Sequence, residues 1–258
     1  MPLIALTRAV PDAISRCELT HLARVPIDLP AAVAQHAEYE RVLTSLGCDV
    51  RHITPTPELP DSVFVEDAAI VLDEVAVITR PGAESRRAEI TSVADALAPY
   101  RTLLRMTAPA TLDGGDVLKL GRMLYVGVGS RTNTAGAEQL AALVAPHGHT
   151  VRAIPIHDCL HLKSAVTEVA AGVILLNPAW VSGDAFAGHA AIDVDPGEPF
   201  GANVLRVGAA VVCASSYPRT AARLRAAGVA IVDVDVSELD KAEAGVTCCS
   251  LIFDVPAA

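Results

Sequence analysis

A unit with a period in the forties recurs along the chain, and this repetition constrains the fold more than any other feature of the sequence. Each unit reads as a polar start, a strand rich in β-branched residues, a tight turn and a second apolar strand. Self-similarity at such a period is typical of a closed or stacked array of one supersecondary unit. The segments that align are residues 64–80, 112–127, 160–176 and 200–213.

Helical patterns follow three of these hairpins, and further strands follow two of the helices. The pattern at 218–226 begins with proline and is followed by Gly228, which are typical start and stop signals of a helix. In the third unit, by contrast, a loop rich in glycine and aspartate leads from Leu176 to Phe200. The expected helices cover 85–97, 134–144 and 218–226, and the further strands cover 151–156 and 229–234.

The two ends of the chain supply a fifth unit when they are joined. Its expected parts are a first strand at 248–253, a second at 3–7, a helix at 29–46 ended by Gly47, and a last strand at 49–53. Pairing the terminal strands would close a ring and remove exposed sheet edges. We therefore predict an α/β fold, a five-fold pseudo-symmetric α/β propeller of ββαβ units closed by the N- and C-terminal strands. It is expected to form a single catalytic domain over residues 1–258.

Residues suited to catalysis recur at one position of the repeat, the polar start of the first strand. In order they are Glu66 and Asp67, Asp113 to Asp116, His161, Asn203 and Cys248. Each has an ordinary structural explanation: a free cysteine is usually buried in a core, and Gly114-Gly115 would suit a turn or bulge. Equivalent positions of a ring converge on its axis, however. Recurrence at that one position favours a site in which carboxylates, a histidine and a cysteine face one another.

Cys248 is a better candidate nucleophile than its neighbour Cys249. In a strand, adjacent side chains point to opposite faces, so only one of the two thiols can face the axis. In such a strand Cys249 would point to the same face as Leu251 and Phe253, which is the more apolar face. Cys248 would then face the axis.

Four motifs carry a resemblance to a known family: Val63-Phe-Val-Glu-Asp67, Leu112-Asp-Gly-Gly-Asp116, His161-Leu-Lys-Ser164 and Gly245-Val-Thr-Cys-Cys249. Together, and in this order, they resemble the signature motifs of the dimethylarginine dimethylaminohydrolases. These belong to the guanidino-group-modifying enzymes, with the arginine deiminases and amidinotransferases. The resemblance spans essentially the whole chain and implies the five-fold propeller expected above. The chain lacks the long helical insertion of arginine deiminases.

The resemblance implies a role for each motif residue. Cys248 would be the nucleophile, His161 the acid and base, and Asp113 the support of both His161 and the substrate. The implied substrate-binding residues are Leu19, Asp61, Glu66, Asp67, Arg86, Arg131 and Ala242. Glu66 and Asp67 would hold the guanidinium, and Arg86 and Arg131 would bind the α-carboxylate. Asp61 would lie near the α-amine, Leu19 in a covering loop, and Ala242 at a backbone contact. Whether Arg86 or its neighbour Arg87 binds the carboxylate stays open.

These residue types suit hydrolysis of a methylated arginine to citrulline. Paired carboxylates can hold a guanidinium by bidentate hydrogen bonds in front of a nucleophile. A cysteine thiolate can add to the guanidinium carbon, form an S-alkylthiouronium and leave again. The reaction needs neither a cofactor nor a metal. Cysteine, histidine and aspartate can also bind zinc, but the sequence shows no ligand spacing for it. The alternatives are an arginine deiminase, a hydrolase of another substituted arginine, or a binding protein without catalysis.

Charge and cysteine content limit the partners and the location. Thirty acidic residues against twenty Lys and Arg give a formal net charge of −10, which disfavours nucleic acids and anionic membranes as partners. No apolar run is long enough to span a bilayer, and the N-terminus lacks the pattern of a secretory signal. The six cysteines form no framework spacing, so reduced thiols in a cytoplasmic protein are expected. The expected partner is a small-molecule substrate. A homodimer stays open, since no sequence patch marks an interface.

Overall fold

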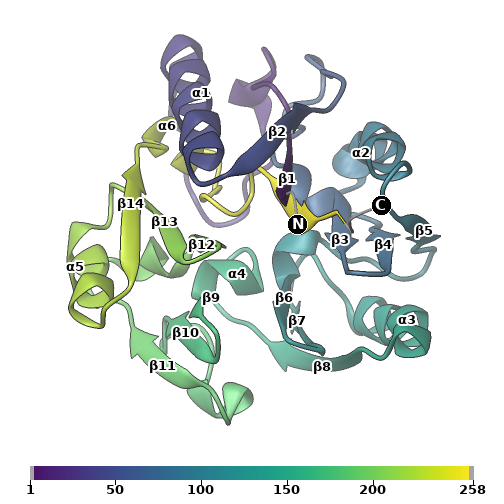
Figure 1. Ribbon diagram of the computed structural model, residues 1–258. Helices are drawn as coiled ribbons and strands as arrows, with labels where there is room; N and C mark the ends of the chain where they lie inside the picture. The colour runs from purple at the N-terminus through teal and green to yellow at the C-terminus, as the bar shows by residue number, and fades with distance from the viewer. Residues whose placement is uncertain (1–2, 256–258) are drawn as a thin grey trace.

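The computed structural model describes residues 3–255 and shows five three-stranded sheets arranged around a central axis (Figure 1). In every sheet the middle strand runs antiparallel to the inner strand and parallel to the outer strand. The predicted five-fold α/β propeller is therefore confirmed.

The strands occupy equivalent places in the five sheets. The inner strands are β3 (Ala69–Val71), β6 (Val117–Leu120), β9 (Val166–Ala170), β12 (Val204–Val207) and β15 (Leu251–Asp254). The middle strands are β4 (Val75–Ile78), β7 (Met123–Val128), β10 (Val173–Leu176), β13 (Ala210–Ala214) and β1 (Leu3–Thr7). The outer strands are β5 (Thr102–Arg105), β8 (Thr150–Pro155), β11 (Ala190–Asp193), β14 (Ala230–Val234) and β2 (Cys48–His52).

The ring is closed by the two ends of the chain, as predicted. β15 pairs antiparallel with β1, with Ile4 opposite Phe253, and β1 pairs parallel with β2. This sheet is assembled from segments at opposite ends of the sequence, which lie side by side in Figure 1. Among the described residues each inner strand, β15 included, pairs with a strand on one side only, so the five sheets stay separate and the expected removal of sheet edges is wrong.

The longer helices surround the ring on its outside, whereas α4 (Leu162–Ala165) lies towards its centre (Figure 1). The helices of at least eight residues are α1 (Leu29–Ser45), α2 (Ile90–Leu97), α3 (Thr134–Val144) and α5 (Pro218–Ala226). Two shorter ones are α4 and α6 (Ser237–Asp240). Local caps set the starts of α1 and α3, since the Asp28 and Asn133 side chains accept hydrogen bonds from the backbone of Ala31 and Gly136. Buried apolar side chains of helices and strands form clusters between neighbouring sheets.

Three sequence expectations need correction. The segment predicted as one helix over 85–97 is a 3₁₀ helix, η3 (Glu84–Glu89), followed by α2. The loop of the third unit contains a strand, β11, which was missed because its four residues are too few for a periodic pattern and are mostly exposed. Cys248 and Cys249 lie in a turn before β15, so the alternation of a strand does not apply to them.

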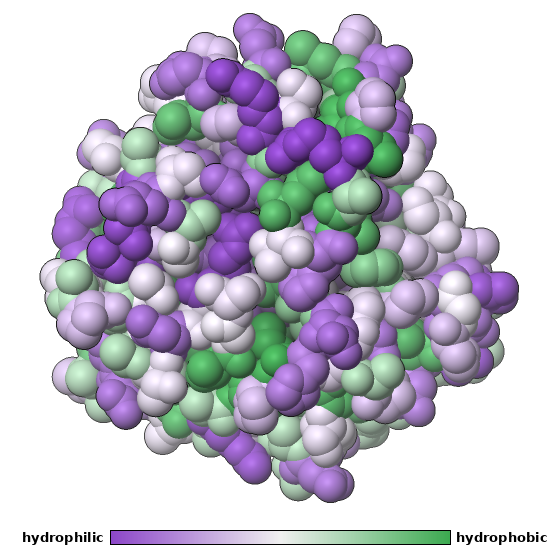
Figure 2. All heavy atoms as spheres, turned by 180° about the vertical axis from the view of Figure 1, so that it is seen from behind, coloured by the Kyte–Doolittle hydropathy of each residue, from purple (hydrophilic) through white to green (hydrophobic). Residues whose placement is uncertain are grey.

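The surface mixes polar and apolar side chains. Figure 2 shows the face opposite to that of Figure 1, where apolar areas alternate with polar ones. Within residues 3–255, the large hydrophobic side chains that stay exposed are Leu22, Val25, Val33 and Phe200. None of the helices in this range is long and apolar enough to cross a membrane.

Candidate active site

Five short turns meet at the centre of the ring, one before each inner strand. They are the 3₁₀ helices η2 (Val65–Ala68), η4 (Gly114–Asp116) and η7 (Pro199–Ala202), helix α4, and the turn at residues 246–249. Neighbouring turns contact one another, η2 with η4, η4 with α4, and α4 with η7. The turns place Asp67, Asp113, His161, Asn203 and Cys248 at the equivalent positions that the repeat predicted. The structure thus brings these residues together at the centre of the ring, where the repeat predicted them.

His161 lies between two carboxylates on neighbouring units. Its Nε2 is 3.2 Å from Asp113 Oδ2, and its Nδ1 is 3.8 Å from Asp67 Oδ1. Burial opposes the imidazolium form, but Asp67, Asp116 and Asp113 together raise the pKa of His161 to about 9. His161 is therefore a cation at neutral pH before substrate binds, and it can serve as an acid.

Asp113 and Asp116 hold His161 and the start of α4 in place. Asp113 Oδ1 accepts a hydrogen bond from the Gly82 backbone at 2.8 Å, which leaves Oδ2 for His161. Asp116 Oδ1 accepts from the Leu162 backbone at 2.9 Å, directly after His161. Burial raises the pKa of Asp116 to about 7, although His161 and Thr132 favour its ionised form. Sequence reasoning assigned no role to Asp116, although it closes the same motif as Asp113.

Gly115 allows the histidine to approach the backbone of the neighbouring unit. A Cβ at this position would lie 2.6 Å from His161 Nδ1 and 2.9 Å from Asp67 Oδ1. The Gly115 amide donates to Asp67 Oδ1 at 3.0 Å. Glycine is thus required here because side chains of two neighbouring units, His161 and Asp67, approach this backbone closely, and not because of a turn conformation.

The Cys248 side chain lines a small cavity together with His161 and Asp67. Its Sγ accepts a long hydrogen bond from the Gly245 backbone at 3.4 Å. Burial, with the charges of Glu66 and Asp67, raises the pKa of the Cys248 thiol to about 12. Cys249 is 1% exposed, packs in an apolar cluster, and does not line this cavity. The choice of Cys248 over Cys249 thus agrees with the geometry, although its parity argument was wrong.

Asn203, the fourth member of the repeat position, braces the turn that carries Cys248. Its Oδ1 accepts from the Thr247 backbone at 3.1 Å, and its Nδ2 donates to Thr247 Oγ1 at 3.0 Å. The side chain also lies against Gly245, where a Cβ would be 2.4 Å from Asn203 Oδ1. Asn203 therefore acts on the nucleophile through the backbone around it.

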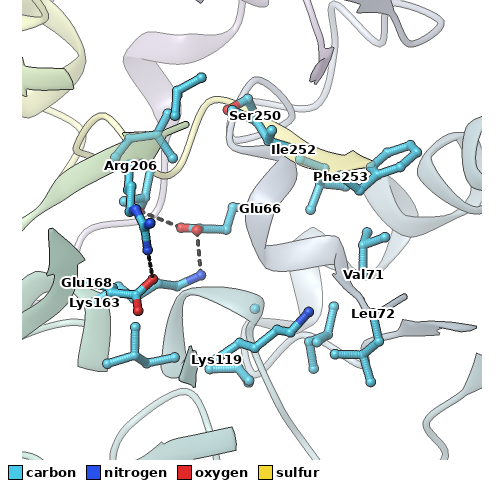
Figure 3. A pocket seen from close by; sticks show the side chains of 18 of the residues that line it. Glu66, Val71, Leu72, Lys119, Lys163, Glu168, Arg206, Ser250, Ile252 and Phe253 are labelled. Atoms are coloured by element: carbon cyan, nitrogen blue, oxygen red, sulfur yellow. Dashed lines mark hydrogen bonds and ion pairs between the residues drawn. The ribbon is translucent and has the colours of Figure 1, made fainter. Parts of the chain in front are cut away.

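The structure separates Glu66 from Asp67, which the sequence treated as a pair. The Glu66 carboxylate bonds Lys163 Nζ and Thr247 Oγ1. It lines a cavity of about 620 Å³ that the inner strands enclose, and Figure 3 shows it directed at Lys163 there. Successive residues of η2 project in different directions, so Glu66 does not line the cavity of Cys248. With the lid in this position, only Asp67 of the two lines the cavity of Cys248.

Arg86 is part of a buried ion-pair network. It donates to Asp67 Oδ2 at 2.6 Å and to Glu89 Oε2 at 2.9 Å, and it also bonds the backbone oxygens of Asp61 and Phe64. Burial raises the pKa of Asp67, but His161 and Arg86 outweigh it and hold that pKa below its usual range. Arg86 lines the cavity, whereas Arg87 donates to Pro81 and Glu84 outside it. Arg86 thus keeps Asp67 ionised. In this conformation its N–H groups are already bonded, so other donors would have to bind the α-carboxylate of a substrate.

Arg131 and Asp61 face the cavity and also contact a loop above it, residues 18–24, which we call the lid. Arg131 Nη2 donates to Thr20 Oγ1 at 3.1 Å, and both oxygens of Asp61 accept from the Glu18 backbone. Ala242 lines the cavity as expected. Leu19 lies in the lid and packs against the apolar cluster of Cys248, but it does not line the cavity.

The lid is fastened by Glu243, a residue that sequence reasoning missed. Its carboxylate accepts hydrogen bonds from three successive backbone amides, those of Thr20, His21 and Leu22. Glu243 has φ of +57°, which is uncommon for a residue other than glycine. The cavity beneath measures only about 20 Å³, roughly the room that one water needs. With the lid in this position, the cavity is therefore too small for an arginine derivative.

Glu243→Gln should loosen the lid because the neutral amide offers one acceptor atom in place of two charged ones. We expect the KM for dimethylarginine to rise about three- to tenfold, in line with the loss of a partly exposed charged hydrogen bond, and kcat to change little. Alkylation of Cys248 by iodoacetamide should accelerate by a similar factor. Glu74→Gln, which alters an exposed glutamate in the turn between β3 and β4 that pairs with Arg122, is the matched control. An unchanged KM and alkylation rate would show that Glu243 does not fasten the lid.

Three side chains of the site could also bind a cation. Asp67, Asp113 and His161 offer ligand atoms that lie within 4.8 Å of one another. In this structure the same atoms are engaged with one another and with Arg86, Gly82 and Gly115. The cluster contains no cysteine. Its members are the acid His161 and the two carboxylates that bind it.

Comparison with known proteins identifies the family. Residues 49–198 match the family model of arginine deiminase. A dimethylarginine dimethylaminohydrolase of Streptomyces coelicolor is 40% identical, over 96% of this chain and 95% of its own length. The chain belongs to the dimethylarginine dimethylaminohydrolase family. A second such enzyme, from Pseudomonas aeruginosa, is 34% identical over 88% of this chain and 90% of its own length.

Solved structures of this family superimpose closely on the chain. The Pseudomonas aeruginosa enzyme, as a Cys-to-Ser mutant complexed with citrulline, has a TM-score of 0.92 at 32% identity and covers 98% of this chain and 100% of its own. A His-to-Gly mutant of a dimethylarginine dimethylaminohydrolase, as an adduct with S-methyl-L-thiocitrulline, has a TM-score of 0.91 at 32% identity, with the same coverage. The N-terminal domain of a cyanobacterial arginine dihydrolase shares the fold, with a TM-score of 0.89 at 19% identity over 99% of each chain.

Proposed function

We propose that this chain hydrolyses Nω-methylated arginines, namely asymmetric dimethylarginine and monomethylarginine, to citrulline and dimethylamine or methylamine. The observation that carries the proposal is the convergence of Cys248, His161 and Asp67 on one lid-covered cavity. A thiol, an imidazolium and a carboxylate are the three groups that attack on a guanidinium carbon requires. Because part of the chain matches the family model of arginine deiminase, hydrolysis of unsubstituted arginine is the alternative.

Asp67 and Arg131 would place the substrate. Asp67, kept ionised by Arg86 and His161, accepts hydrogen bonds from the guanidinium, and its carboxylate is buried while the lid is closed. Arg131 and Asp61 lie on the same cavity and can exchange their lid contacts for the α-carboxylate and α-amine. The guanidinium carbon would then lie in front of Cys248 Sγ.

The chemical step proceeds through a covalent intermediate. As the cationic substrate binds, the Cys248 thiol releases its proton to solvent water, and the resulting thiolate sulfur bonds to the guanidinium carbon. His161, as imidazolium, gives a proton to the methylated nitrogen, the C–N bond breaks, and the neutral amine leaves. The now neutral His161 takes a proton from water, which adds to the carbon of the thiouronium. The Cys248 sulfur departs and takes up the proton of the new hydroxyl group, which restores the neutral thiol and leaves citrulline.

The thiol depends on its substrate for activation. With a pKa of about 12, Cys248 is a neutral thiol in the free protein at pH 7. A bound guanidinium brings a positive charge beside the sulfur and replaces the water around it, which lowers the thiol pKa. Attack is thereby coupled to binding of a cation.

A substrate panel tests the proposal directly. Arginine, monomethylarginine, asymmetric dimethylarginine and agmatine are incubated with the protein, and citrulline and released amine are measured. We expect citrulline from both methylated arginines at rates well above that from arginine, unaffected by dialysis against a chelator. Ammonia release from arginine as the fastest reaction would favour a deiminase, and loss of activity on chelation would favour a metal hydrolase.

The raised thiol pKa predicts how alkylation of Cys248 depends on pH. A neutral reagent such as iodoacetamide reacts with the thiolate, so its rate should rise about tenfold per pH unit from pH 6 to pH 9 without a plateau. The cationic reagent chloroacetamidine should react at least about tenfold faster than the neutral chloroacetamide at pH 7.5, because it mimics the guanidinium. A plateau with a midpoint below pH 8 would mean that the thiolate forms without substrate.

Arg131→Ala should separate amino-acid substrates from decarboxylated ones. A charge-assisted contact to a carboxylate contributes about 1.5–3 kcal/mol, so kcat/KM for dimethylarginine should fall roughly tenfold to a hundredfold. The slow turnover of agmatine, which has no carboxylate, should hardly change. An equal fall for both substrates would mean that Arg131 acts through the lid or the fold instead.

Two further features stay predictions from the sequence: a single domain over residues 1–258 and a cytoplasmic location. The closed ring of sheets supports the single domain, and the free cysteines accord with the cytoplasmic location. Whether the protein forms a homodimer stays open. Gel filtration with light scattering tests the oligomeric state.

A further inference from the structure

A second cavity adjoins the reaction centre on the same side of the ring. It measures about 140 Å³, and Cys248, Leu160, Glu243 and Ala244 line both it and the cavity of His161. The two cavities therefore meet at the nucleophile. We call the larger one the side cavity. None of the roles assigned above uses it.

The walls of the side cavity are largely apolar. They include Leu22 of the lid, Cys159, Phe200, Ala214 and Tyr217. A dry apolar cavity of about 150 Å³ is large enough for benzene, so this one has room for more than two methyl groups. Its shape and chemistry suit an alkyl group rather than a polar one.

Two acidic residues, Glu243 and Asp240, interrupt the apolar lining. The Glu243 carboxylate is already bonded to the lid amides, which leaves that of Asp240. Its only side-chain hydrogen bond within the described residues comes from Ser216 Oγ at a long 3.4 Å, and none of their basic side chains forms an ion pair with it. Burial raises the pKa of Asp240 to about 7. A half-buried carboxylate without a cation, at the wall of an apolar cavity, is complementary to an alkylammonium ion.

These observations assign a subsite, given the proposed function on which the assignment rests. We propose that the side cavity holds the Nω-alkyl groups of the substrate and then the amine that leaves, with Asp240 as counter-ion of the alkylammonium. When the C–N bond breaks, the amine has received one proton from His161. It takes its second from water and becomes the cation that Asp240 attracts. The cavity thus sets which alkyl substituents the site accepts.

Binding to the inactive Cys248→Ser protein tests the subsite without turnover. Dissociation constants are measured by calorimetry for Nω-methyl-, Nω-ethyl- and Nω-propyl-arginine. Each added methylene that enters an apolar cavity should tighten binding up to about fourfold, so affinity should increase along the series to propyl. Weaker binding of the ethyl than the methyl compound would overturn the assignment. Equal binding of all three, which places the substituent in water, would do so as well.

Two variants change the size of the cavity in opposite directions. Ala214→Leu fills the cavity. It should lower kcat/KM for propyl-arginine by a factor at least about ten times larger than that for methyl-arginine. Because Ala214 is buried and the variant could fail to fold, Phe200→Ala provides the second test. Phe200 is 39% exposed and its removal should enlarge the cavity, so longer substituents should be favoured. Variants that alter all substrates by one factor would contradict the proposal.

Asp240→Asn tests the charge. Inhibition by dimethylammonium should weaken at least about fivefold in this variant, and in the parent it should strengthen between pH 6 and pH 8 as Asp240 ionises. Asp235→Asn is the matched control, because Asp235 lies near Asp240 but does not line the cavity. Equal inhibition of both variants would remove Asp240 from the subsite. If methylarginines gave no citrulline at all, the proposed function would fail, whereas hydrolysis with no response to substituent or charge would refute the subsite alone.

Discussion

Cys248→Ser is expected to lower kcat for dimethylarginine at least about a thousandfold, because the hydroxyl cannot replace a thiolate as nucleophile and leaving group. Cys249→Ser should keep activity within about threefold, since Cys249 is buried in an apolar cluster and lines neither cavity at the reaction centre. Citrulline formation at saturating substrate measures both.

The matched pair of cysteines also controls for folding. A hydroxyl at the buried Cys249 position can destabilise the protein by about 1–3 kcal/mol, so melting temperatures are compared and Cys249→Ala serves as a milder variant. Equal loss of activity in folded Cys248→Ser and Cys249→Ala proteins would mean that the nucleophile is assigned wrongly.

His161→Gln should lower kcat for dimethylarginine about 10²- to 10⁴-fold, the usual contribution of a positioned acid and base. Glutamine approximates the shape of histidine and can still accept or donate a hydrogen bond toward Asp113, but it transfers no proton. Alkylation of Cys248 by chloroacetamidine should persist, because the nucleophile and the acid are separate groups on separate units. Turnover within tenfold of the parent would exclude His161 as the proton carrier.

The repeat predicted the ring and the position of the site because both depend on local pattern. In each unit, apolar runs and turn residues indicate where the strands lie. Because the period is constant, equivalent positions of the units come together at the centre of the ring. Closure by β1 and β15 followed from the need of edge strands for partners. Helices with clear start signals, such as α3 after Asn133, were predicted with their observed bounds.

The parts that sequence reasoning missed depend on contacts between distant segments. Glu66 and Asp67 are adjacent in sequence, and only Lys163 and Thr247, from two other units, reveal that their side chains separate. Gly115 needs to be glycine because His161 approaches it from the next unit. Glu243 fastens a lid more than two hundred residues away in sequence. No local period encodes these partners.

The turn of Cys248 illustrates a correct residue chosen for the wrong local reason. Strand alternation was expected to separate Cys248 from Cys249, yet both precede β15. Asn203 and Gly245 shape the backbone there, and the resulting turn exposes one thiol to the cavity and buries the other.

The covalent intermediate is the central claim, and mass spectrometry of His161→Gln protein treated with S-methyl-L-thiocitrulline tests it most directly. The methylthio group leaves without needing a proton from His161, so Cys248 can attack, while hydrolysis stalls because no base activates water. We predict one thiouronium adduct per chain, located by fragmentation on Cys248 and not on Cys249. A folded, ligand-binding protein with no adduct, or with the adduct on another residue, would contradict the account.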